Sequence, residues 1–135
     1  MEVSARYLRD SKFEVAARGH RAICDQPVEN GGADAGMTPP EFLLASLATC
    51  AAYYAAQYLK TRQLAAQDLN VRVVAEKGAQ PARLGSFQIE VTVPGLDDRH
   101  RAGILRAVKA CLIHNTLVGG PSIEIAILTP AAAEV

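Results

Sequence analysis

The sequence predicts an α+β fold in which antiparallel sheets pack on a long central helix and on a second, later helix. Segments in both halves of the chain alternate apolar and polar residues with the period of two that is typical of β-strands. Residues 42–59 are instead almost continuously apolar and follow a helix-start signal. The predicted order is three strands, a helix, two strands, a helix and a strand, and this order favours antiparallel sheets over parallel ones.

The composition is that of one domain covering residues 1–135. Half of the residues are apolar, which is enough for a sizeable core. The 14 acidic and 14 basic residues balance, so we expect neither nucleic acid nor a membrane as a partner. The first residues do not resemble a signal peptide, and the odd number of cysteines, three, indicates reduced thiols, so we expect a cytoplasmic protein.

The N-terminal part is predicted to form three strands. Residues 3–7 and 13–17 alternate in polarity on either side of a turn at Asp10 and Ser11, which predicts a hairpin. Residues 21–24 form a short third strand. A polar, glycine-rich loop over residues 28–37 then leads to the central helix, and loops of this length are often functional.

The central helix begins with a clear signal. Thr38 can cap it, Pro39 suits its first position, and Glu41 completes a capping box. Residues 42–59 then leave no side that clearly prefers water, so we expect a soluble core helix and not a membrane span. Because one sheet covers only one side of such a helix, the sequence predicts an obligate homodimer.

Two strands follow the central helix. Residues 69–73 alternate in polarity, and residues 87–93 do so most regularly of all. Residues 77–85, which include a glycine and a proline, are predicted to connect them.

A second helix and a last strand complete the predicted fold. Asp97 or Asp98 caps the helix, and apolar residues at helical spacing place Cys111 on or beside its inward stripe. Residues 115–120 are predicted to break the helix, and residues 123–127 to form the last strand before a frayed alanine-rich end.

Two segments resemble the OsmC/Ohr family of osmotically inducible and organic hydroperoxide resistance proteins, in its OsmC-like branch. Residues 31–50 read GGADAGMTPPEFLLASLATC, and residues 111–117 read CLIHNTL. The connection at residues 81–84 is similar to the family's middle hairpin, so the resemblance covers almost the whole chain. It implies an intertwined α+β homodimer.

The resemblance also implies thiol chemistry in defence against oxidative stress. Peroxidase members of the family reduce organic hydroperoxides with two cysteines, which would make Cys50 the peroxidatic thiol and Cys111 the resolving thiol. Cys50 would become a sulfenic acid and then condense with Cys111 to a disulfide. A dithiol, of the lipoyl type in peroxidase relatives, would reduce this disulfide, and no cofactor or metal is implied.

The resemblance suggests further site residues. A thiol in the middle of a helix needs a nearby cation, because the helix dipole does not act there. In the family an arginine of the N-terminal sheet, held by a glutamate, fills this place. Arg21 is the preferred candidate for the arginine, Arg18 is the alternative, and Glu41 is the candidate for the glutamate.

The remaining candidates have equally plain structural interpretations. Phe42, Tyr53 and Tyr54 could line an apolar substrate pocket, although core packing is the usual role of aromatic residues on a buried helix. His114 could face the second cysteine or could simply end a helix. Cys24 matches no motif and is interpreted as structural.

The chain departs from the family pattern at two positions. Leu112 follows Cys111 where members commonly have proline, which would let the helix continue. Glu41 stands one position later than the glutamate of the best-known peroxidases, where this chain has Pro40. These differences match a less characterised branch of the family.

Two other functions are compatible with the sequence. One is a non-enzymatic protein that binds a small molecule or senses through its thiols. The other is a metal site built from Cys50, Cys111 and His114, for which a single Cys-x-x-His spacing is a weak signal.

Overall fold

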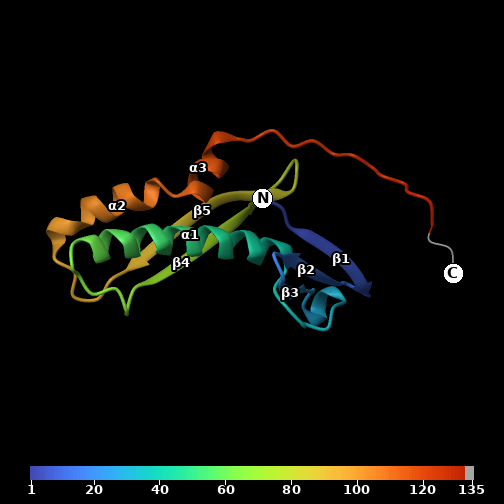
Figure 1. Ribbon diagram of the computed structural model, residues 1–135, viewed down its shortest axis with the longest axis horizontal. Coiled ribbons are helices and arrows are strands. Elements are labelled where there is room, and N and C mark those ends of the chain that lie inside the picture. Colours follow the sequence, from blue (N-terminus) through green and yellow to red (C-terminus); the bar gives the residue numbers. More distant parts are fainter. Residues whose placement is uncertain (133–135) are drawn as a thin grey trace.

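The computed structural model describes residues 1–132. Its elements are β1 (Ser4–Arg9), β2 (Lys12–Ala17), β3 (His20–Cys24), α1 (Pro39–Thr61), β4 (Asn70–Gly78), β5 (Arg83–Thr92), α2 (Arg101–Lys109) and α3 (Leu112–Gly119), with short 3-10 helices at Val28–Asn30 and Asp98–His100. In the described residues the strands form two antiparallel sheets, ordered β1-β2-β3 and β4-β5. The predicted α+β class is confirmed (Figure 1).

Helix α1 begins as predicted. The side chain of Thr38 accepts a hydrogen bond from the Glu41 amide at 3.4 Å, and the Glu41 carboxylate accepts one from the Thr38 amide at 3.0 Å. Every fourth residue of one stripe is fully buried: Leu47, Ala51, Ala55 and Leu59. This stripe packs on β4, β5 and α2. The helix is long and apolar enough to cross a membrane by length and composition, yet its partners are those of a core helix.

The core around the C-terminal half of α1 depends on a close helix contact. A Cβ atom added to Gly103 of α2 would lie 2.3 Å from the hydroxyl oxygen of Tyr58 on α1. That ring is held in place, because its hydroxyl is hydrogen-bonded to His100 Nδ1 at 3.0 Å and the Arg62 guanidinium lies 3.7 Å from its centroid. The glycine is therefore needed for α1 and α2 to approach each other.

We expect Gly103→Ala to destabilise the protein by about 1–3 kcal/mol, because the added methyl group has no room beside the Tyr58 ring. Thermal unfolding measures this loss. Gly119→Ala is the matched control, since a Cβ atom at Gly119 meets nothing within 4 Å. Equal melting temperatures for the two variants would contradict the predicted contact.

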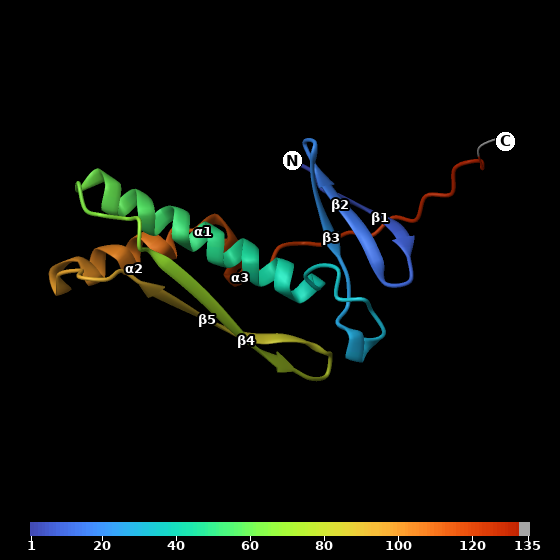
Figure 2. The same cartoon turned by 90° about the horizontal axis from the view of Figure 1, so that it is seen from below.

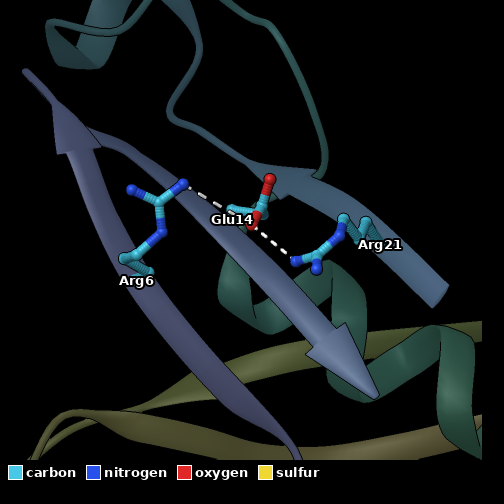
Figure 3. Close-up of polar contacts among 3 residues, drawn as sticks. All are labelled: Arg6, Glu14 and Arg21. Atoms are coloured by element: carbon cyan, nitrogen blue, oxygen red, sulfur yellow. Dashed lines mark hydrogen bonds and ion pairs between the residues drawn. The ribbon is translucent and has the colours of Figure 1, made fainter. Parts of the chain in front are cut away.

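The N-terminal sheet has one apolar and one polar face. Tyr7 and Phe13 are paired across β1 and β2, with their rings in edge contact at a centroid distance of 5.5 Å. On the other face, Glu14 lies between Arg6 at 3.7 Å and Arg21 at 2.8 Å (Figure 3). The sheet stands at the beginning of α1 and apart from β4 and β5 (Figure 2).

Two predictions for the C-terminal part are wrong. The second helix does not continue through Cys111: α2 ends at Lys109, and α3 covers most of the predicted break at residues 115–120. The predicted strand at residues 123–127 is not formed within the described chain. Ile123, Ile125 and Ile127 are instead more than 80% exposed, at 84%, 86% and 83%, because no strand of the same chain lies beside them.

The second pair of strands is longer than predicted. β4 and β5 extend into the predicted connection at residues 77–85, so that only residues 79–82 join them. Between β5 and α2 lies an apolar groove of about 520 Å³, which we call the α2–β5 groove. Its apolar lining comes mainly from Ile89, Val91, Val93, Ala102, Leu105 and Val108.

One chain leaves a large surface uncovered. Its accessible surface is 10472 Å², whereas a compact monomer of 14.4 kDa exposes roughly 6,800 Å². The uncovered apolar side chains include Tyr7 and Phe13 on the N-terminal sheet and the isoleucines of residues 123–127. In Figure 1 the C-terminal segment runs away from the rest of the chain.

Candidate active site

Cys50 and Cys111 lie near each other, although they are 61 positions apart in the sequence, because the segment that begins α3 packs on α1. Cys50 is half-buried in the middle of α1, and Cys111 is fully buried directly before α3. Burial raises the pKa of the Cys111 thiol, and a hydrogen bond with the Cys50 thiol raises it further. All three cysteines, each within the described residues, are free thiols.

The contact arises because the chain bends sharply at Cys111. This residue has a φ of −55° and a ψ of 131°, so it is extended between two helices. Its sulfur accepts a hydrogen bond from the His114 amide at 3.5 Å and so caps α3. The sequence offered no glycine or proline to mark this bend. The bend is stabilised by the burial of Cys111 and by its capping bond.

This arrangement suits chemistry that joins two sulfurs. A sulfenic acid formed on the more exposed Cys50 would already have a second thiol beside it. Because the pKa of Cys111 is raised, this second thiol stays protonated near neutral pH. The accessible and the buried thiol are therefore chemically distinct.

Glu41 is engaged at the start of α1. Its carboxylate accepts hydrogen bonds from the Thr38 amide and hydroxyl at 3.0 and 2.8 Å, and these bonds lower the pKa of Glu41. Nine residues separate it from Cys50, which corresponds to roughly 13 Å along the helix axis. Within one chain Glu41 and Cys50 are thus separate.

The two candidate arginines lie on the N-terminal sheet and not beside Cys50 of the same chain. Arg21 is on the polar face of the sheet and pairs with Glu14 at 2.8 Å. Arg18 is in the turn between β2 and β3, with a φ of 52°. The sheet that carries both arginines stands at the beginning of α1, whereas Cys50 lies in the middle of this helix (Figure 2).

The aromatic candidates on α1 are partly exposed. Tyr53 is 61% exposed and contacts Tyr54 edge-on, with ring centroids 5.5 Å apart, while Phe42 is half-buried. None of the three lines the α2–β5 groove. The ring of His114 is hydrogen-bonded to Asn115, with Nδ1 3.1 Å from Oδ1.

A metal site finds no structural counterpart in residues 1–132. No three side chains of His, Cys, Asp or Glu come together there as a set of ligands.

Asp25 is a residue of the region that the sequence analysis missed. Its carboxylate is fully buried at the end of β3. Oδ1 accepts hydrogen bonds from the Ser11 hydroxyl at 2.5 Å and the Gln26 amide at 2.8 Å, and Oδ2 accepts from the amides of Ala33 and Ala35 at 3.1 and 3.0 Å. The only signal in the sequence was an aspartate between a strand and a glycine-rich loop.

These hydrogen bonds predict how stability depends on pH. Led by the one from Ser11, they hold the pKa of Asp25 far below its usual range. Because the pKa of the folded state is depressed, the contribution of Asp25 to stability is present above a pH of about 4 and is lost as pH falls further. In urea unfolding, we expect the difference in stability between wild type and Asp25→Asn to shrink below this pH.

The control for this experiment is Glu29→Gln, which removes an exposed carboxylate from the same loop. It should follow the pH dependence of the wild type. A stability difference for Asp25→Asn that is the same at pH 7 and pH 3 would contradict the prediction.

The fold and the sequence over most of the chain have counterparts among known proteins. The sequence model of a family described as OsmC-like protein matches residues 31–126. No curated protein matches this chain.

Several solved structures share the fold. A Psychrobacter arcticus protein named for the osmotic stress and detoxification response has a TM-score of 0.76 at 20% identity, covering 84% of this chain and 85% of its own. An OsmC like protein from Mycoplasma pneumoniae has a TM-score of 0.70 at 21% identity, covering 88% and 87%. An organic hydroperoxide resistance protein from Legionella pneumophila has a TM-score of 0.61 at 17% identity, covering 87% and 88%.

Proposed function

Because this chain belongs to the OsmC-like protein family, we propose that it reduces organic hydroperoxides with Cys50 as the attacking thiol and Cys111 as the resolving thiol. The observation that carries the proposal is that a half-buried thiol, Cys50, lies near a fully buried thiol, Cys111. The name of the Legionella pneumophila neighbour, an organic hydroperoxide resistance protein, agrees with this chemistry.

The proposed reaction has three steps. The Cys50 thiolate attacks the terminal oxygen of R–O–O–H; an S–O bond forms, the O–O bond breaks, and R–O⁻ takes up a proton and leaves as an alcohol. Cys50 is now a sulfenic acid. The sulfur of Cys111 displaces its hydroxyl group, which leaves as water with the proton of Cys111, and a disulfide forms. A dithiol of the lipoyl type then reduces the disulfide and is itself oxidised.

The attack step needs positive charge near Cys50. In the proposed mechanism an arginine of the N-terminal sheet supplies it, either Arg21 or Arg18, and does so from a second copy of the chain. Arg21 would first have to give up its ion pair with Glu14, whereas Arg18 forms no ion pair within the described chain. Glu41 of the second copy is the proposed anchor for this arginine, and Phe42, Tyr53 and Tyr54 are the proposed walls for the substrate.

The proposed working unit is a cytoplasmic homodimer. The surface exceeds that of a compact monomer by several thousand Å², which is the range that obligate dimers bury. The apolar face of the N-terminal sheet, the α2–β5 groove and the outer sides of α1 are the surfaces that a second copy would cover.

Consumption of cumene hydroperoxide with dihydrolipoamide as reductant tests the proposed function. We expect turnover by the wild type and, without the reductant, a disulfide between Cys50 and Cys111 in peptide mass spectrometry. A protein that consumes no hydroperoxide but carries a bound molecule or a stable thiol adduct would instead be a binding or sensing protein.

We expect Cys111→Ser to make Cys50 sensitive to overoxidation. Without a resolving thiol, the sulfenic acid on Cys50 persists and reacts with a second hydroperoxide to give sulfinic acid. Intact-mass spectrometry after each equivalent of hydroperoxide measures the added oxygen atoms. Cys24→Ser, which removes the third thiol, is the control. Resistance of Cys111→Ser to overoxidation would show that another group resolves Cys50.

A further inference from the structure

Asp25 connects three separate parts of the chain. It directly follows β3, and its carboxylate accepts hydrogen bonds from Ser11 in the turn between β1 and β2 and from the amides of Ala33 and Ala35 in the segment before α1. Within the described residues it is the one charged side chain that is fully buried. A buried carboxylate with four donors is strongly constrained, because the loss of any donor leaves charge uncompensated.

The segment around this carboxylate, which we call the Asp25 loop (residues 25–37), packs closely against its own backbone and that of β3. A Cβ atom on Gly32 would lie 1.9 Å from the carbonyl oxygen of Gln26, and one on Gly36 would lie 1.9 Å from that of Ile23. The amide of Asp25 also donates to the carbonyl of Met37 at 3.2 Å. The Asp25 loop is therefore a compact, closely packed connection between β3 and α1.

The position of the N-terminal sheet relative to α1 depends on the Asp25 loop. Strands β1, β2 and β3 pack mainly on one another, and Figure 2 shows them standing apart from β4 and β5. At its other end the loop leads directly into the capping box of Thr38 and Glu41 that begins α1. A change in the Asp25 loop would thus rotate the sheet relative to α1.

We propose that Asp25 is a positioning residue that locks the Asp25 loop and so fixes the direction in which the N-terminal sheet reaches a second copy. This inference rests on the proposed function, in which an arginine of that sheet acts on Cys50 of the second copy. Asp25 contacts no reacting atom. It acts through the sheet that carries Arg18 and Arg21.

A distance measurement tests, independently of catalysis, whether Asp25 fixes the position of the N-terminal sheet relative to α1. Spin labels at Lys12→Cys on β2 and Lys60→Cys on α1 report the distance between sheet and helix. The chain has its own cysteines replaced, and the labelled protein is diluted with unlabelled protein. We expect one narrow distance distribution, which becomes at least twofold broader with Asp25→Asn and less so with Ser11→Ala. Equal widths in all three proteins would overturn the proposal.

A double-mutant cycle then tests the link to the site in the otherwise native protein. We expect Asp25→Asn, at a temperature where circular dichroism shows it folded, to lower kcat/KM for cumene hydroperoxide about tenfold, while Glu29→Gln leaves it unchanged. Arg18 and Arg21 are each replaced by alanine, and the variant that lowers kcat/KM is combined with Asp25→Asn. The second substitution should lower kcat/KM little further, because both substitutions act on the same contact.

The two failures can be distinguished. Effects of Asp25 and the arginine that are fully additive would overturn the positioning role, since a residue that only stabilises the fold acts independently. A wild type that consumes no hydroperoxide would overturn the proposed function, and the spin-label distances would still decide whether Asp25 locks the sheet.

Discussion

Replacing Cys50 with serine is expected to lower hydroperoxide turnover by ~10³-fold or more, because a hydroxyl group is a far weaker nucleophile than a thiolate toward the O–O bond. Ferrous-xylenol assay of residual hydroperoxide measures the effect. The substitution exchanges one atom on the half-buried side of α1, so the protein should remain folded.

Cys24→Ser is the matched control, since Cys24 is also a free thiol but lies at the end of β3. It should leave turnover unchanged. If Cys50→Ser turns over hydroperoxide within a few-fold of the wild-type rate, another residue must be the attacking nucleophile.

Deleting residues 121–135 is expected to weaken dimerisation at least ~100-fold. The deleted segment carries Ile123, Ile125, Ile127 and Leu128, each more than 80% exposed in one chain. Burying one such side chain contributes about 1.5–3 kcal/mol, and 2.8 kcal/mol corresponds to roughly 100-fold in affinity, so partial burial of the four is sufficient. Sedimentation equilibrium over a range of concentrations measures the dissociation constant.

A shorter deletion, of residues 129–135, keeps these four apolar residues and serves as the control. It should dimerise as the wild type does. An unchanged dissociation constant after the longer deletion would show that the isoleucines have another partner, and a monomeric wild type would remove the basis of the proposed dimer.

Local signals predicted much of the fold. Thr38, Pro39 and Glu41 marked the start of α1 because a capping box is built from neighbouring residues. The alternating residues of β1, β2, β4 and β5 predicted strands because one face of each sheet is more apolar than the other. The strand predicted at residues 123–127 is not formed, although its residues alternate in polarity. A strand also needs a neighbouring strand to pair with, and alternation in the sequence does not supply one.

Features that depend on packing could not be predicted in the same way. The helical spacing placed Cys111 on the second helix, yet its bend and its contact with Cys50 depend on how α3 packs on α1. The pairing of Arg21 with Glu14 depends on the register of β2 and β3. The burial of Asp25 requires donors from two distant segments, which no local pattern reveals.

The cap that Cys111 provides makes the beginning of α3 sensitive to the redox state of this cysteine. Its sulfur accepts the His114 amide proton at 3.5 Å, and α3 has only eight residues. A disulfide would bond this sulfur to Cys50 and so change the acceptor at the first turn of a short helix. The chemical shift of the His114 amide in a nitrogen-15 spectrum would then show whether the two cysteines are reduced or form a disulfide, without any substrate.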